Sequence, residues 1–179
     1  MSRIGISLLI LLFISGCVDP EEVVINSAEL YFDIPTFVKN YENTHSSTKV
    51  TKKVVLNDKE ETKEIADYNF KQELDLMSGF DINKPSMGGK YSKNEIQEDN
   101  GEVRTVYSAN EKDLKTQEVE VIRSQNEIVA IKITGAQKTI LSENNQSIIF
   151  APEKSYHLLS EDKNRFGKKI KKEILITFN

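Results

Sequence analysis

The sequence predicts an α+β fold: two N-terminal helices packed on one face of an antiparallel, hairpin-rich sheet, which could curve into a half-barrel. Three observations lead to this prediction. Apolar residues recur with helical spacing in two segments between residues 33 and 80, with one strand-like segment between them. From Tyr91 onward the apolar period changes to two. The links between these alternating segments have the length of hairpin turns.

The first helix is expected to begin after Asp33, a good N-cap residue, with Pro35 in the first turn, where no backbone N–H is needed. Its apolar stripe has the spacing i, i+3, i+4 and i+7 and consists of Ile34, Phe37, Val38 and Tyr41. A turn at 43–47, containing His45, follows. Residues 49–57 then alternate, which predicts a strand.

A second helix is predicted to begin at Asp58, because Asp58 and Glu61 have the spacing of a capping box. Its apolar face consists of Ala66, Phe70, Leu74 and Met77, and Gly79 ends it. The opposite side is acidic. This acidic side would suit a cation or a basic partner, but a solvated helix face is the favoured interpretation. Its residues are Glu60, Glu64, Asp67, Glu73 and Asp75.

Strands occupy the rest of the chain. Segments 91–97 and 102–109 flank Asn100-Gly101, a strong hairpin signal, and segments 118–123 and 127–134 form a second hairpin. Shorter strands are expected at 138–142, 147–150 and 156–160, with a turn at Asn144-Asn145, before a long final strand. We expect one core, in which helical and sheet residues meet: Phe37, Tyr41, Phe70, Leu74 and Met77 against Val121, Ile131, Ile174 and Ile176.

The N-terminus has the pattern of an export signal. Arg3 precedes an uncharged apolar segment, and the run from Ile4 to Val18, at 15 residues, is shorter than the roughly 20 that a membrane span needs. The motif Ile14-Ser15-Gly16-Cys17 resembles the lipobox of bacterial lipoprotein precursors. The resemblance implies cleavage between Gly16 and Cys17, and lipid attachment to the thiol of Cys17. An ordinary signal peptide would also fit the length, but it would not require a cysteine here.

This resemblance divides the chain into a signal peptide (1–16), a lipidated N-terminus with a tether (17–27) and a single α+β domain (28–179). It implies anchoring in the cell envelope, with the outer membrane favoured because Val18, and not an aspartate, follows the cysteine. Asp19, Glu21 and Glu22 resemble the surface-export signals of Bacteroidota lipoproteins, and the mature domain resembles small lipoproteins of that kind. A solvated linker explains these acidic residues equally well.

Composition narrows the chemistry. Without its first 16 residues the chain has 23 basic and 28 acidic side chains, a balance that argues against a nucleic-acid partner. One cysteine permits no disulfide within the chain. His45 and His157 are far apart in the sequence, no His or Cys cluster has the spacing of metal ligands, and no phosphate loop or nucleophile motif is present. No cofactor or catalytic residue is therefore assigned.

Two classes of function remain. In the favoured one, the domain is a noncatalytic binding or structural module for an envelope protein or an apolar ligand, with Tyr91, Tyr107 and Tyr156 as the possible ligand surface. For any one of these tyrosines, a position in the core is the favoured interpretation. In the alternative, it is an envelope hydrolase that uses Asp and Glu carboxylates on glycan or peptide. Four lysines near the C-terminus suit either anionic lipid or polysaccharide, or the exposed face or edge of a strand: Lys168, Lys169, Lys171 and Lys172.

Overall fold

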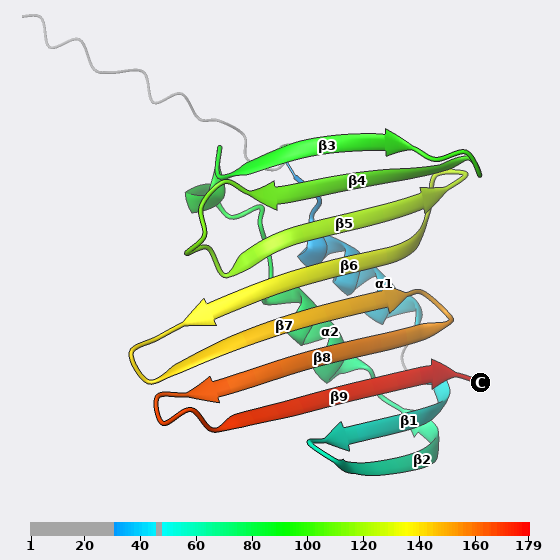
Figure 1. Cartoon of the computed structure of the whole chain (residues 1–179). Coiled ribbons are helices and arrows are strands. Elements are labelled where there is room, and N and C mark those ends of the chain that lie inside the picture. Colours follow the sequence, from blue (N-terminus) through cyan, green and yellow to red (C-terminus); the bar gives the residue numbers. More distant parts are fainter. Residues whose placement is uncertain (1–30, 46–47) are drawn as a thin grey trace, which may run out of the picture.

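The computed structural model describes residues 31–45 and 48–179. Within them, nine strands form one open antiparallel sheet in the order β2-β1-β9-β8-β7-β6-β5-β4-β3, shown in Figure 1. From β3 to β9 each strand pairs with the next one along the chain, whereas β1 pairs with the C-terminal strand β9. The mixed α+β class and the antiparallel sheet predicted from the sequence are confirmed at this level.

The first helix is confirmed in detail. Helix α1 (Ile34–Thr44) begins after Asp33, whose carboxylate accepts hydrogen bonds from the Thr36 N–H (2.9 Å) and the Thr36 hydroxyl (2.8 Å). Ile34, Val38 and Tyr41 are buried, as the stripe predicted. Strand β1 (Thr48–Leu56) follows and matches the predicted strand closely.

The second predicted helix is wrong in its first half. Residues predicted as helical from Asp58 form strand β2 (Lys59–Tyr68), and the helix α2 (Lys71–Ser78) begins only after Phe70. Asn57, with a φ of 55°, and Asp58 make a tight hairpin turn, so Asp58 does not cap a helix. Backbone pairing with β1 stabilises β2 as a strand. Two ion pairs between the same strands add to this pairing: Lys53–Glu60 (2.9 Å) and Lys49–Glu64 (3.7 Å). Gly79 ends α2, as predicted.

The hairpins predicted beyond residue 90 are largely confirmed. After a short 3₁₀ turn, η2 (Pro85–Met87), the strands are β3 (Tyr91–Gln97), β4 (Glu102–Ala109), β5 (Thr116–Ser124), β6 (Glu127–Lys138), β7 (Ser142–Ala151), β8 (Ser155–Asn164) and β9 (Lys169–Phe178). One segment is corrected. Residues 139–141 form a turn where a strand was predicted, and Asn144 and Asn145 lie inside β7 instead of forming a turn. The explanation of the C-terminal lysines by an edge strand is also wrong, because β9 lies between β8 and β1.

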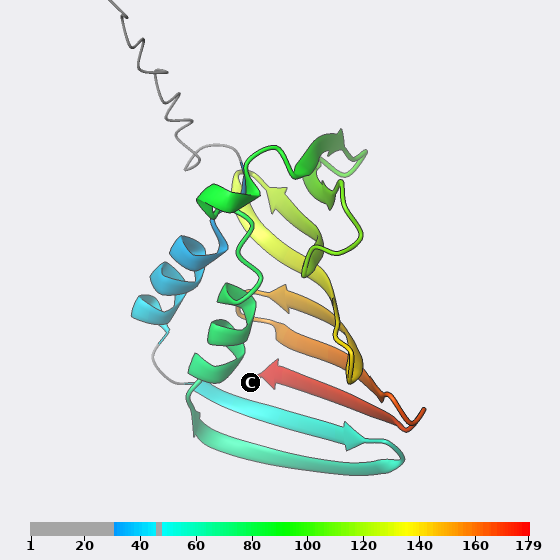
Figure 2. The same cartoon turned by 90° about the vertical axis from the view of Figure 1, so that its left-hand side faces the viewer.

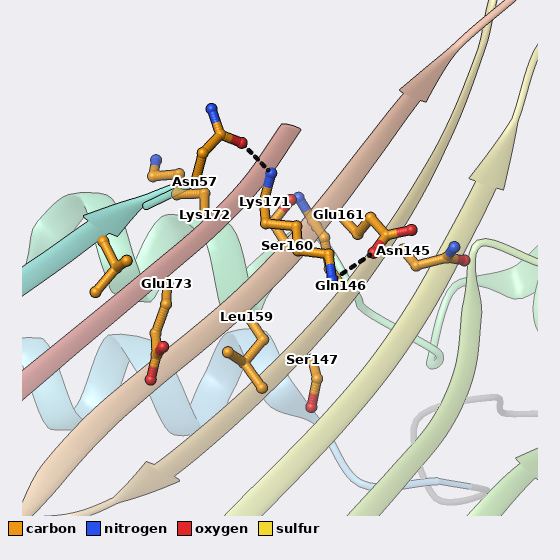
Figure 3. Close-up of a pocket in the computed structure, with 11 residues that line it drawn as sticks. Asn57, Asn145, Gln146, Ser147, Leu159, Ser160, Glu161, Lys171, Lys172 and Glu173 are labelled. Atoms are coloured by element: carbon orange, nitrogen blue, oxygen red, sulfur yellow. Dashed lines mark hydrogen bonds and ion pairs between the residues drawn. The ribbon is translucent and has the colours of Figure 1, made fainter. Parts of the chain in front are cut away.

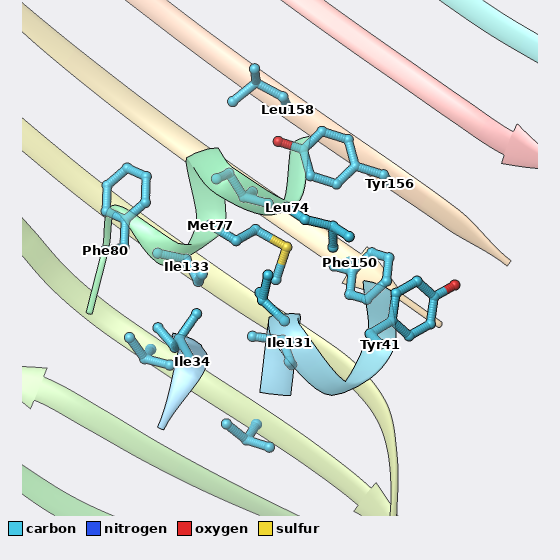
Figure 4. Packing of buried hydrophobic residues seen from close by; sticks show 14 of the residues in the cluster. Ile34, Tyr41, Leu74, Met77, Phe80, Ile131, Ile133, Phe150, Tyr156 and Leu158 are labelled. Atoms are coloured by element: carbon cyan, nitrogen blue, oxygen red, sulfur yellow. The ribbon is translucent and has the colours of Figure 1, made fainter. Parts of the chain in front are cut away.

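The buried residues form a single cluster. Figure 2 shows α1 and α2 on the same side of the sheet, and Figure 4 shows their side chains meeting those of the strands. The Tyr41 ring of α1 lies edge-on to Phe150 of β7 at 5.0 Å. Eight of the nine residues expected in the core are buried, and Phe37 is partly buried against them. Each Å² of apolar surface removed from water stabilises a fold by roughly 25 cal/mol, so the burial of this cluster is the main stabilising contribution.

Candidate functional site

The side of the sheet that carries no helix, here called the helix-free face, contains a hollow of about 490 Å³ over β1, β9, β8 and β7, shown in Figure 3. Because side chains alternate along a strand, residues that are paired across neighbouring strands line up in rows on one face. Two such rows line the hollow. The first is Val55, Glu173, Leu159 and Ser147, and the second includes Lys171, Glu161 and Asn145.

Leu159 forms the apolar centre of the hollow. It is 43% exposed, and Val55 lies two strands away in the same row. Figure 3 shows Glu173, Leu159 and Ser147 projecting side by side from neighbouring strands. Ile149, 36% exposed, continues the apolar surface on β7, and its strand partner is His157. A patch with an apolar centre and a polar rim is the usual composition of a protein interface.

Both acidic side chains in the hollow are paired with bases. Glu173 Oε1 lies 2.8 Å from His157 Nε2, and Glu161 Oε1 lies 2.8 Å from Lys169 Nζ. The hydrogen bond from Lys169 holds the pKa of Glu161 below its usual range, and Lys171 (3.7 Å from Glu161) acts in the same direction. Glu161 is therefore suited to a charged position on the rim of the hollow, whereas a general acid needs a raised pKa.

The three tyrosines predicted as a ligand surface lie in the core instead. Tyr91 and Tyr107 are each 6% exposed and Tyr156 is 0% exposed. Tyr91 and Tyr107 both pack edge-on against Tyr31, at 5.5 and 5.9 Å, while Tyr156 packs against Phe70 on another part of the sheet. The expectation of an exposed tyrosine surface is thus corrected: the strand period places these side chains on the face that the helices cover, and their rings are large enough to fill that layer.

A buried carboxylate lies beneath α2, where the sequence suggested a solvated one. Glu73 is 5% exposed; its Oε1 accepts hydrogen bonds from the Tyr68 hydroxyl (2.6 Å) and from Lys52 Nζ (3.2 Å). Lys52 also donates to the Tyr68 hydroxyl and lies 4.7 Å above that ring. The cluster of Lys52, Tyr68 and Glu73 joins β1, β2 and α2. Such a buried pair fixes how elements meet, because either charge left alone there would be costly.

Two buried oxygen atoms at this cluster have no hydrogen-bond partner among the described residues: Glu73 Oε2 and the Tyr156 hydroxyl. Burial and the charge of Glu73 raise the pKa of Tyr156 well above its usual value. The pKa of Tyr68 is raised by burial and by its hydrogen bond to Glu73. Both tyrosines are therefore neutral at any physiological pH, and Tyr68 acts as a hydrogen-bond donor.

Three further findings concern the residues predicted from the sequence. The lipobox residues, Gly16 and Cys17 included, and the tether lie outside the described residues. In the described part of the chain, no group of three or more His, Cys, Asp or Glu side chains could hold a metal ion. No helix in residues 31–45 or 48–179 is long and apolar enough to cross a membrane.

No protein-family model, no curated protein and no solved structure matches the chain.

Proposed function

We propose that this protein is a lipid-anchored lipoprotein of the bacterial cell envelope, whose single domain binds a partner on its helix-free face and catalyses no reaction. The anchor is inferred from the motif Ile14-Ser15-Gly16-Cys17, and the favoured outer-membrane location from Val18. The observation that carries the binding proposal is the hollow centred on Leu159, an exposed apolar side chain flanked by the Lys169–Glu161 ion pair and the His157–Glu173 contact.

An envelope protein is the partner that this surface suits best. Leu159 and Ile149 offer apolar contact, while Ser147 and Asn145 offer hydrogen bonds around them. The hollow is open and shared by four strands, so an extended segment of a partner can lie across it. The excess of acidic over basic side chains makes nucleic acid an unsuitable partner.

We also infer that α1 and α2 form a permanent layer, around which the sheet curves as a half-barrel. Ring contacts support this arrangement: Phe37 and Tyr41 of α1 lie 6.1 and 5.0 Å from Phe150, and Phe70, just before α2, lies 6.5 Å from Tyr156. A helix layer of this kind fills one face of the sheet and leaves the opposite face for a partner.

The test places a charge at the centre of the hollow. Leu159→Lys is compared with Ile96→Lys, because Ile96 has a similar exposure (38%) but lies on the edge strand β3. Each chain is immobilised and incubated with detergent-solubilised envelope from the native host. We expect a defined partner to be retained by the unchanged chain and by Ile96→Lys, and lost from Leu159→Lys. Equal retention by both variants would refute binding at this hollow.

The hydrolase alternative is tested on the same material. Turnover of a cell-wall, glycan or peptide substrate, abolished by one Asp or Glu substitution that preserves the fold, would overturn the noncatalytic proposal. Glu73→Gln is the first variant to make, because Glu73 is the most buried carboxylate among the described residues and has a hydroxyl and an ammonium group in contact. Circular dichroism must show that this variant still folds, because the change leaves the charge of Lys52 without its partner.

A further inference from the structure

Exposed apolar side chains gather at one end of the sheet. Among the described residues, eight large apolar side chains are exposed, and five of them lie at the end where the turns β1–β2, β6–β7 and β8–β9 are found: Leu56, Ile140, Leu141, Phe166 and Ile170. Ile140 is 94% and Phe166 is 84% exposed. Figure 1 shows the β6–β7 and β8–β9 turns next to each other. We call Ile140, Leu141 and Phe166 the apolar tip.

Hydrogen bonds hold the two turns of the apolar tip in a fixed shape. The Arg165 N–H donates to the carbonyl of Leu141 at 2.8 Å, which joins one turn to the other. The side chain of Asn164 accepts from the N–H groups of Phe166 and Lys168, both at 3.0 Å. Gly167 supplies the positive φ (81°) that the second turn needs. The tip side chains are thus presented to solvent by an ordered backbone, and exposed apolar surface of this kind marks an interaction site.

Basic side chains surround the apolar tip. Lys138, Lys163, Arg165 and Lys168 are all exposed, and none forms an ion pair with a described residue. A hollow of about 430 Å³ between the two turns is lined by three of these bases, by Ile140 and Leu141, and by one acidic side chain, Glu143, which leaves the bases in excess. This cluster is positive although the chain as a whole carries a net charge of −4. Its charge is complementary to that of an anionic surface.

We propose that the apolar tip docks on a lipid bilayer with anionic headgroups. Ile140, Leu141 and Phe166 enter the interfacial layer, and Lys138, Lys163, Arg165 and Lys168 contact headgroup phosphates. Apolar side chains projecting from a ring of cations match both layers of such a membrane surface, since the cations are attracted to anionic lipid and the apolar groups to the acyl boundary. This contact is separate from the proposed lipid at Cys17 and would set the orientation of the domain on the membrane.

The experiment measures tryptophan fluorescence, and because the sequence contains no tryptophan, one that is introduced is the only tryptophan that reports. Phe166→Trp places a single tryptophan at the tip, and Ile96→Trp places one near the opposite end of the sheet, on β3. Both variants are made in the full chain carrying Cys17→Ser, so that no lipid is attached. Each is mixed with vesicles of phosphatidylglycerol and phosphatidylethanolamine, with and without bromine on the acyl chains.

We expect the emission of Phe166→Trp to move to shorter wavelength and to be quenched by brominated lipid, while Ile96→Trp shows neither change. Adding Ile140→Ser and Leu141→Ser should weaken vesicle binding of the Phe166→Trp chain by about tenfold or more, because two apolar side chains no longer leave water. Vesicles of phosphatidylcholine alone, or 0.5 M salt, should weaken binding in the same direction, because the cations lose their attraction to the surface.

Three outcomes would overturn the proposal. In the first, Phe166→Trp is not quenched. In the second, Ile96→Trp is quenched equally, which would mean that another part of the chain brings the protein to the vesicle. In the third, soluble polyphosphate changes the emission but brominated lipid does not, which would make the basic cluster a site for a soluble polyanion. Because every chain carries Cys17→Ser, none of these results depends on whether Cys17 is lipidated or whether the Leu159 hollow binds a partner.

Discussion

Gly135 is packed so closely that we expect even a single added methyl group to destabilise the fold. A Cβ atom added there would lie 2.2 Å from Cε1 of Phe80 and 3.0 Å from the carbonyl oxygen of Lys115. Carbon atoms in contact are about 3.5 to 4.0 Å apart, so the Phe80 ring would have to move by roughly 1.3 Å or more. Phe80 is 1% exposed, and Thr116 Oγ1 donates to its carbonyl at 3.0 Å, so neither the ring nor its backbone is free to move.

We therefore expect Gly135→Ala to lower the free energy of unfolding by about 2 to 3 kcal/mol, the upper part of the range for overpacked cores. In a domain of this size each kcal/mol lowers the melting temperature by about 2 to 4 °C. Circular dichroism followed through heating and through urea measures both quantities. The matched control is Gly88→Ala, because the nearest atom there, the Pro85 carbonyl oxygen, is 3.7 Å away and φ is −53°; we expect a change within about 0.5 kcal/mol.

A double mutant separates this explanation from a general loss of flexibility. Phe80→Leu removes the ring edge that the new methyl group meets, so the pair Gly135→Ala with Phe80→Leu should be more stable than the sum of the single effects by about 1 kcal/mol or more. If Gly135→Ala costs no more than Gly88→Ala, or if the two effects simply add, then the Phe80 ring does not close against Gly135 and the reasoning is wrong.

Three more predictions follow from the anchor, from the partly buried Tyr68 and from the buried Tyr156. Cys17→Ser should leave an uncleaved precursor or release the chain from membranes, whereas mass spectrometry of a mature chain with a free thiol would refute lipidation. Tyr68→Phe should cost about 1.5 to 3 kcal/mol, because its hydroxyl donates to the buried Glu73, while Tyr156→Phe should cost less than about 1 kcal/mol, because its hydroxyl has no partner among the described residues; equal urea midpoints would contradict this. Burial raises the pKa of both Tyr68 and Tyr156, so the contribution of these two tyrosines to the free energy of unfolding should be fully present below about pH 10, where unfolded tyrosine ionises. The free energy of unfolding should then fall as the pH rises further, and the fall should be shallower in Tyr156→Phe.

Local signals in the sequence predicted most of the elements. The Asp33 cap, the stripe from Ile34 to Tyr41 and the Asn100-Gly101 turn depend on neighbouring residues only, and the structure agrees with all three. The segment after Asp58 was mispredicted because its pattern is ambiguous. Of residues 59–68 only Ile65 and Tyr68 are even half-buried, so the segment has no strong apolar period of either kind. The segment is a strand because it pairs with β1. Asn57 favours the hairpin turn that brings the two strands together, but the residue alone does not determine that they pair.

The environment of Glu73 shows a second limit. On a helical wheel this residue belongs to an acidic, apparently solvated side, and α2 alone gives no reason to bury it. The reason comes from two residues on other elements, Lys52 of β1 and Tyr68 of β2, which meet Glu73 only after the hairpin has folded back under the helix. A carboxylate that is buried because of distant partners leaves no trace in its own neighbourhood, which is why sequence patterns predict apolar cores better than buried charges.

The Leu159 hollow depends on a still longer-range event, the pairing of β1 with β9. Alternation along each strand already places Val55, Ser147, Leu159 and Glu173 at outward positions, but it does not say which strands are neighbours. Val55 joins the row only because β1 pairs with the last strand, and Asn57 fixes that register from both sides: its N–H donates to the Lys171 carbonyl at 2.8 Å, and its side chain accepts from the Lys171 N–H at 3.0 Å. More than 100 residues separate the two partners, so loop closure disfavours their meeting until β3 to β9 have formed. We therefore expect the candidate site to be completed late in folding, by a contact that no local pattern encodes. A one-residue slip of β1 against β9 would turn Val55 away from it.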